Sequence, residues 1–120
     1  MADFRELRVY QEAFDLAVDI YTRARKFPSV EARVLVSQLR RSALSVPLNI
    51  AEGHGRRVSQ KDFTHFVAVA IGSVNETLVL LDFALRMGYL KEEEHRTFCE
   101  RYTVLVKQLK SLFTKLRQNG

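Results

Sequence analysis

The apolar residues along the chain recur with the period of an α-helix and divide it into four long segments. In the first, residues 8–26, apolar side chains lie three or four positions apart until Phe27-Pro28. The residue before a proline is disfavoured in the α region, so this helix is predicted to end there. The second segment, residues 30–54, has the same spacing and stops at Gly53-His54-Gly55. No segment alternates with the period of two that a half-buried strand requires.

A proline inside the second segment predicts a kink. Pro47 has no N–H to donate to the Ala43 carbonyl, and its ring clashes with that carbonyl. The apolar pattern nevertheless continues in phase beyond the proline. This continuity favours one kinked helix over two separate helices.

The third and fourth segments have clear end signals and a regular seam. The third covers residues 59–87, with Ser59 as the predicted N-cap and Gly88 just past the end. The fourth covers residues 92–117, where apolar side chains lie alternately three and four positions apart, as in a coiled-coil seam. Four helices with short connections predict an all-α, up-down-up-down four-helix bundle with a proline-kinked second helix. Residues 1–120 are expected to form this single domain.

The third segment is apolar on two opposite sides. At about 100° per residue, five positions fall opposite the core stripe that contains Phe63 and Leu81. A helix of this kind is buried on both sides, either deep within one subunit or against a second one. We favour a subunit interface, because exposed apolar patches mark contact sites. The predicted interface residues are Val69, Gly72, Leu80, Phe83 and Met87.

Charge and composition indicate a basic protein of a reducing compartment. The formal net charge is +5, and basic residues gather in the second and fourth segments, which favours polyanionic partners. The lone Cys99 leaves no intrachain disulfide among these residues. The N-terminal residues lack the apolar region of a signal peptide, and polar residues interrupt the most apolar run, residues 67–85. We therefore expect a cytoplasmic protein with no membrane partner.

The sequence shows no catalytic or cofactor motif. His95 and Cys99 share a helix face, but zinc takes three or four protein ligands, and no other histidine has matching spacing. Gly53-His54-Gly55 follows a helix and lacks the Lys-Ser/Thr ending of a phosphate loop, so it is interpreted as a helix end. We expect no enzymatic activity, no cofactor, no metal and no small-molecule substrate.

The richest polar cluster surrounds Pro47. Arg40, Asn49 and Glu52 are expected to lie close together around the kink, and Arg56 follows Glu52 at ion-pair spacing. In one interpretation the cluster stabilises the bend: Asn49 donates to carbonyls freed by the proline, and Arg40 neutralises Glu52. In the other, basic residues near this helix and on the fourth helix bind phosphates. These candidate nucleic-acid ligands are Arg41, Arg56, Arg57, Lys107, Lys110 and Lys115.

Three stretches of the chain match a known family. They are residues 4–11 (FRELRVYQ), residues 38–43 (QLRRSA) with 49–53 (NIAEG), and residues 70–76 (AIGSVNE). Over residues 4–118 the chain resembles the bacterial 23S rRNA intervening-sequence proteins, also described as ribosomal-protein-like. The resemblance implies a four-helix bundle assembled as a ring-like homo-oligomer, a pentamer, with rRNA or a ribonucleoprotein as the conjectured partner.

The chain departs from the family pattern at two positions. Tyr10 stands where many relatives have tryptophan, and Leu48 stands where a small polar residue is common. Leu48 makes its surface less polar and so weakens the transfer of a binding site to that face. Neither departure alters the expected fold.

Two functional hypotheses follow from the sequence. The first is a non-enzymatic oligomeric bundle that binds RNA or a ribonucleoprotein through its basic surfaces. The alternative is an oligomeric scaffold or adaptor with a protein partner and no nucleic acid. Binding that weakens steeply with salt favours RNA, and salt-insensitive association with a protein favours the adaptor.

Overall fold

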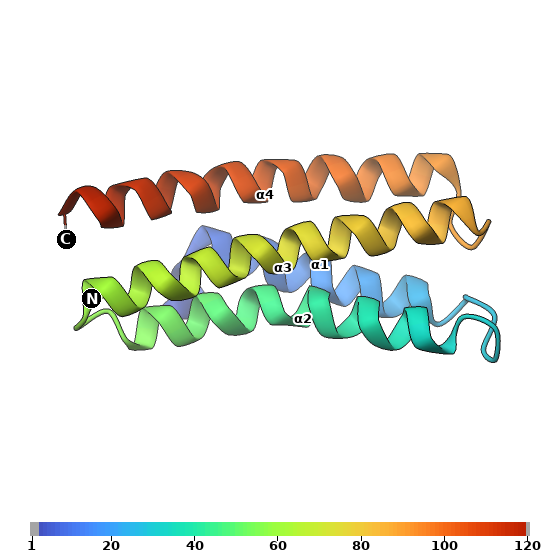
Figure 1. The fold of residues 1–120 in the computed structure, drawn as a ribbon, viewed down its shortest axis with the longest axis horizontal. Coiled ribbons are helices and arrows are strands. Elements are labelled where there is room, and N and C mark those ends of the chain that lie inside the picture. The colour runs from blue at the N-terminus through green and yellow to red at the C-terminus, as the bar shows by residue number, and fades with distance from the viewer. Residues whose placement is uncertain (1–2, 120) are drawn as a thin grey trace.

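Four long helices, connected up-down-up-down, make up the computed structural model, which describes residues 3–119 (Figure 1). The molecule measures 46 × 21 × 20 Å. The all-α four-helix bundle predicted from the sequence is confirmed. In chain order the elements are the short 3-10 helix η1 (Phe4–Glu6), α1 (Arg8–Ala24), α2 (Arg33–Gly55), α3 (Gln60–Arg86) and α4 (Glu92–Asn119).

The helix ends lie close to the predicted ones, and the largest displacement is at the start of α2. Ser59 caps α3 as predicted, since its hydroxyl accepts a bond from the Asp62 N–H at 3.2 Å. Gly88 follows α3 with a positive φ of 82°, which glycine adopts readily. The predicted start of α2 at residue 30 is wrong. The backbone after Pro28 first forms a turn, in which the Ala32 N–H donates to the Pro28 carbonyl at 3.0 Å, and α2 begins at Arg33.

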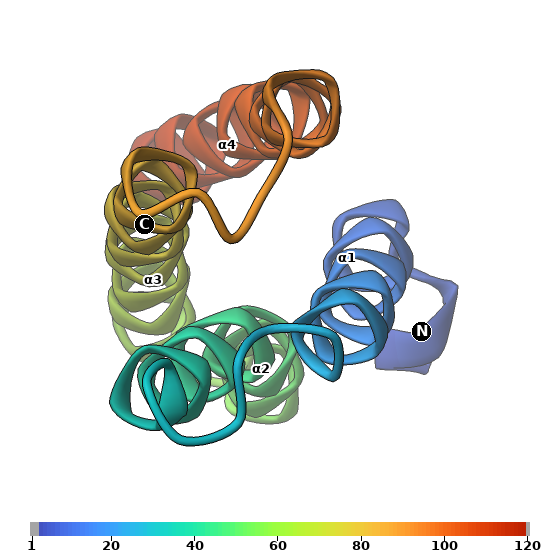
Figure 2. The same cartoon turned by 90° about the vertical axis from the view of Figure 1, so that its right-hand side faces the viewer.

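Helices that are neighbours in the chain are also neighbours in space. Viewed end-on, α1 to α4 follow one another around the bundle axis (Figure 2). Among the four helix pairs that touch, α2 and α3 share the most extensive contact and α1 and α4 the least extensive one. The predicted apolar stripes meet on the inside, where Leu16, Val67, Tyr102 and Leu109 are fully buried.

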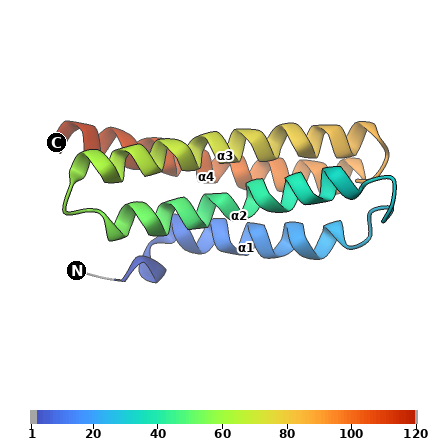
Figure 3. The same cartoon turned by 60° about the horizontal axis from the view of Figure 1, so that its bottom comes forward.

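The second helix runs through Pro47 without interruption, between α1 and α3 (Figure 3). Pro47 is buried, and a single continuous helix is confirmed. The kink itself stays a prediction. Beside the proline, small hydroxyl side chains join α2 to α3: Thr77 donates to Ser42 at 2.8 Å, and the Ser45 and Ser73 hydroxyls lie 2.8 Å apart. These bonds satisfy polar groups that burial would otherwise make costly.

By length and composition alone, α3 would also qualify to span a membrane. Core helices of soluble proteins have the same composition, and here one side of α3 packs into the bundle through Phe63, Val67 and Val74. The absence of a membrane partner stays a prediction.

Candidate nucleic-acid interface

Arg40 lies apart from the polar residues that follow Pro47. Its Nη2 donates to the Tyr21 carbonyl on α1 at 3.2 Å, and its guanidinium carbon lies 5.0 Å from the centre of the Tyr21 ring. Glu52 is about three helical turns, or ~18 Å, further along α2. It pairs instead with Arg56, Nε to Oε2 at 2.9 Å. The prediction that Arg40 neutralises Glu52 is therefore wrong, because each group has a nearer partner.

Asn49 makes a helix-stabilising contact of the predicted kind, but at a different carbonyl. Its Nδ2 donates to the Ser45 carbonyl at 2.8 Å and to the Ser45 hydroxyl at 2.9 Å. The carbonyl that Pro47 deprives of a backbone donor is that of Ala43. Asn49 thus orients the Ser45 hydroxyl that contacts α3.

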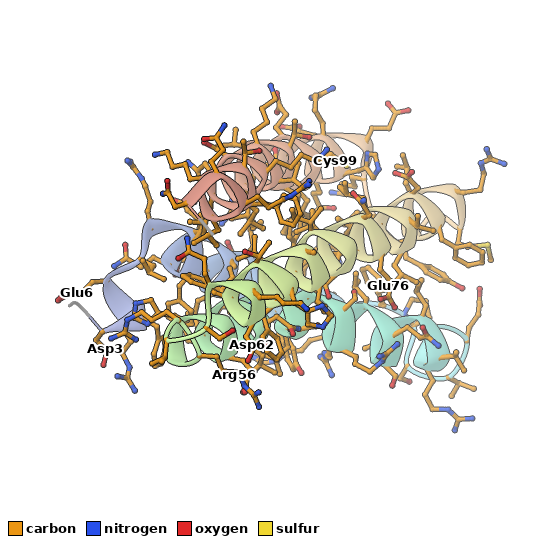
Figure 4. The ribbon with its side chains drawn as sticks, turned by 60° about the vertical axis from the view of Figure 1, so that its left-hand side comes forward. Asp3, Glu6, Arg56, Asp62, Glu76 and Cys99 are labelled. Atoms are coloured by element: carbon orange, nitrogen blue, oxygen red, sulfur yellow. The ribbon has the colours of Figure 1, made fainter. Side chains whose placement is uncertain are left out.

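The two arginines just past the end of α2 already have partners within the chain. Besides Glu52, Arg56 faces Asp62, with Nη1 and Oδ2 3.9 Å apart (Figure 4). Arg57 donates to the His54 carbonyl at 2.8 Å. Burial, followed by the charge of Arg57, lowers the pKa of His54 and so favours its neutral ring. A phosphate at Arg56 must compete with two carboxylates.

The other four predicted ligands are more available. Arg41 pairs with Glu76 at 3.3 Å, but both side chains are largely exposed, so this surface pair contributes little (Figure 4 labels Glu76). Lys107, Lys110 and Lys115 are exposed on α4. None of these lysines forms an ion pair with any other residue between 3 and 119.

The structure adds a basic site that the sequence analysis missed. A cavity of 570 Å³ lies between the end of α1 and the start of α2. No acidic residue is among its described lining residues, and Ser29 and Ser37 add hydroxyl groups. The spacing of three of its arginines in the sequence could have indicated one shared helix face. We call it the arginine pocket; its arginines are Arg25, Arg33, Arg40 and Arg41.

Donor groups in the arginine pocket are left unused by the described part of the chain. Arg25 and Arg33 form no ion pair there, and the buried Nε of Arg40 has no hydrogen-bond partner. The α2 helix begins at this place, and its N-cap residue Ala32 provides no side-chain cap. The positive end of the helix dipole adds to the arginine charges. Such a site favours an anion with several oxygen atoms.

Most of the predicted interface residues on α3 face outward. Val69, Phe83 and Met87 are exposed, and a Cβ at Gly72 would meet nothing within 4 Å. Leu80 differs, since it is partly buried and packs against the core. Phe83 and Met87 line an apolar groove of 440 Å³ between α2 and α3, which we call the α2/α3 groove. Val34 and Val79 also line it, and the sequence analysis did not predict them.

A second apolar surface lies on the other side of α2. It is a groove of 400 Å³ between α1 and α2, the α1/α2 groove. Exposed apolar side chains line it and continue to Leu48, which is 59% exposed. The large apolar residues of the α1/α2 groove are Phe14, Val18, Tyr21 and Leu44.

Comparison with known proteins places the chain in a family. Residues 5–111 match the model of a family described as 23S rRNA-intervening sequence protein. The chain belongs to this family. A crystal structure of a protein of unknown function from the S23 ribosomal protein family of Bacteroides thetaiotaomicron is similar to it, with a TM-score of 0.79 and 28% identity. That similarity covers 88% of this chain and 97% of the other. No curated protein matches the chain.

The family match includes the principal basic groups. The arginine pocket and the end of α2 fall within the part of the chain that matches the 23S rRNA-intervening sequence family. On α4, Lys107 and Lys110 are included, whereas Lys115 lies beyond the match. The family resemblance inferred from the sequence motifs is confirmed.

Proposed function

We propose that this protein is a non-enzymatic, oligomeric helical bundle that binds RNA, alone or within a ribonucleoprotein. The arginine pocket carries the proposal, because it presents four guanidinium groups and no acidic side chain among its described lining residues. Membership of the 23S rRNA-intervening sequence family supports RNA as the polyanion. The exposed lysines of α4 form a second basic group, toward the opposite end of the bundle from the arginine pocket.

The chemistry of these groups favours the phosphate backbone over the bases. A guanidinium offers a planar fork of donors that matches two phosphate oxygens. Reading of single-stranded bases requires aromatic platforms. Phe63, Phe98 and Tyr102 are buried in the core, and the exposed rings of Phe14, Tyr21 and Phe83 line the two apolar grooves. Binding should therefore depend strongly on salt and weakly on RNA sequence.

Replacing Arg25 and Arg33 by glutamine should weaken RNA binding and flatten its salt dependence. The slope of log affinity against log salt should fall by about one unit for each lost phosphate contact. Replacing Arg56 and Arg57 should have a smaller effect, because these arginines exchange intrachain partners for phosphate. Fluorescence anisotropy with a labelled structured RNA, titrated over a range of salt, measures the slopes.

The matched control for these variants is Arg96→Gln. Arg96 is exposed on α4, outside the arginine pocket, and forms no ion pair with any residue from 3 to 119. The Arg96→Gln variant should leave the slope of log affinity against log salt unchanged. Absence of wild-type binding at low salt would reject RNA in favour of a protein-binding adaptor.

We also propose that the subunits assemble head-to-tail into a ring, a pentamer in the expected form. The support is the presence of two different apolar surfaces, one on each side of α2. A two-fold dimer needs only one self-complementary patch, whereas a ring joins two unlike patches of successive subunits. Pairing the α2/α3 groove with the α1/α2 groove would cover both.

Phe83→Glu should dissociate the ring, since it places a charge in a desolvated contact. Val18→Glu should do the same from the other groove. Mixing the two variants should produce a heterodimer, because each supplies the surface that the other has lost. Light scattering coupled to size exclusion measures the masses, with Val104→Glu as control: Val104 is 55% exposed on α4, away from both grooves. A monomeric wild type, or unchanged mass of Phe83→Glu, would refute the ring.

A further inference from the structure

Three potential metal ligands converge on the side of the bundle where α3 packs against α4. His95 and Cys99 lie one turn apart on α4, and Asp82 reaches them from α3. Their ligand atoms all lie within 4.8 Å of one another. Figure 4 labels Cys99 on α4. The packing of the two helices thus supplies the third ligand that the sequence spacing lacked.

Two of the three distances between these atoms are close to those of a tetrahedral site, and the third, from Asp82 to Cys99, is at most 4.8 Å. His95 Nε2 lies 2.7 Å from Asp82 Oδ1 and 3.4 Å from Cys99 Sγ. Zinc binds nitrogen and oxygen at about 2.0–2.2 Å and sulfur at about 2.3 Å, so tetrahedral neighbours are roughly 3.3–3.6 Å apart. The His95–Cys99 separation already falls in this range. The Asp82–His95 pair must open by only about 0.6 Å, measured against the same tetrahedral spacing.

We propose that Asp82, His95 and Cys99 form a zinc-binding site with three protein ligands and one position open to water or an external ligand. Thiolate and imidazole together select zinc over magnesium or calcium, which prefer oxygen ligands. On binding, the Cys99 thiol releases its proton to solvent, and the thiolate and the Asp82 carboxylate balance the two positive charges.

The burial of the three side chains suits an accessible but anchored site. Asp82 is 69% exposed and gives the ion a path from solvent, whereas the His95 side chain is only 20% exposed. Cys99 is half-buried and has no disulfide partner. A bound ion would join α3 to α4 and bind only the folded chain, so zinc should raise the melting temperature.

Titration of the metal-free protein with Co²⁺ tests the site directly. A tetrahedral site with a thiolate ligand should give intense visible bands and a sulfur-to-cobalt charge-transfer band in the near ultraviolet, saturating at one ion per chain. Zn²⁺ should displace the cobalt and abolish both signals. Thermal unfolding with and without Zn²⁺ gives the second readout.

Asp82→Asn, His95→Gln and Cys99→Ser should each weaken Co²⁺ binding by roughly tenfold or more. Cys99→Ser should also remove the charge-transfer band while circular dichroism stays that of a folded bundle. The control is His65→Gln, which changes an exposed histidine near the other end of α3. Two results would overturn the proposal. One is a Co²⁺ spectrum of octahedral type without the sulfur-to-cobalt band, and the other is a Co²⁺ affinity of Cys99→Ser equal to that of the wild type.

Discussion

Replacing Gly53 with alanine should lower the free energy of unfolding by about 1–3 kcal/mol. A Cβ at this position would lie 2.8 Å from the Cβ of Phe66 and 3.1 Å from Cδ1 of Phe63. The Phe66 Cβ is fixed to the α3 backbone and cannot rotate away. The end of α2 and the start of α3 must therefore move apart to make room for the added methyl group.

The matched control is Gly55→Ala, two residues later in the same helix. Nothing lies within 4 Å of a Cβ at Gly55, and the residue has no positive φ. Alanine should stabilise the protein there by about 0.5–1 kcal/mol, because it loses less backbone freedom on folding. Urea unfolding of both variants measures the difference. Equal stabilities for the two would contradict close α2–α3 packing as the reason for Gly53.

Glu94→Gln should destabilise the bundle by about 1–2 kcal/mol at neutral pH, and the difference should shrink in acid. Arg23 holds the Glu94 carboxylate with two bonds, Nε at 2.6 Å and Nη2 at 2.9 Å. The hydrogen bond from Arg23 is the main cause that lowers the pKa of Glu94 from 4.5 to about 2. The whole shift corresponds to roughly 3 kcal/mol, which partial exposure to solvent reduces.

The sign of the pH effect follows from the lowered pKa. Folding favours the ionised Glu94, so the pair stabilises fully above pH 4.5 and its contribution is lost as pH falls toward 2. Urea unfolding at intervals over this range measures the loss. Asp19→Asn is the control, because the Asp19–Arg101 pair at 2.7 Å is more exposed and should contribute less. A Glu94→Gln deficit that stays constant from pH 7 to 2 would contradict this account.

The helices could be predicted because the signals that define them, apolar spacing and capping residues, act locally in the sequence. Apolar spacing, Ser59 and Gly88 each act within a few residues of the boundary they set. The start of α2 could not be placed, since the apolar spacing extends back to residue 30 while the backbone after Pro28 forms a turn. Pro47 shows that a longer pattern can outweigh a local signal, because the apolar spacing continues through the proline and α2 remains one helix.

The candidate sites depend on the pairing of helices, which the spacing along one helix does not specify. Arg25 reaches the arginine pocket from the end of α1, and Asp82 reaches His95 from α3. Arg40 was assigned to Glu52 because both lie on α2, whereas its partner is a carbonyl of α1. What could be predicted from the sequence is exposure that depends on a single helix face, as at Phe83 and Lys110.

The order of the helices around the bundle has a consequence for how the chain folds. Nearly all packing joins segments adjacent in sequence, and such contacts close short loops at low entropic cost. Among the four long helices the α1–α4 contact is the exception, with its ion pairs formed by residues 71 and 82 positions apart. Folding should thus proceed rapidly from the α2–α3 hairpin outward, and the junction of the first and last helices should form late. Weakening that junction should speed unfolding while leaving the folding rate almost unchanged.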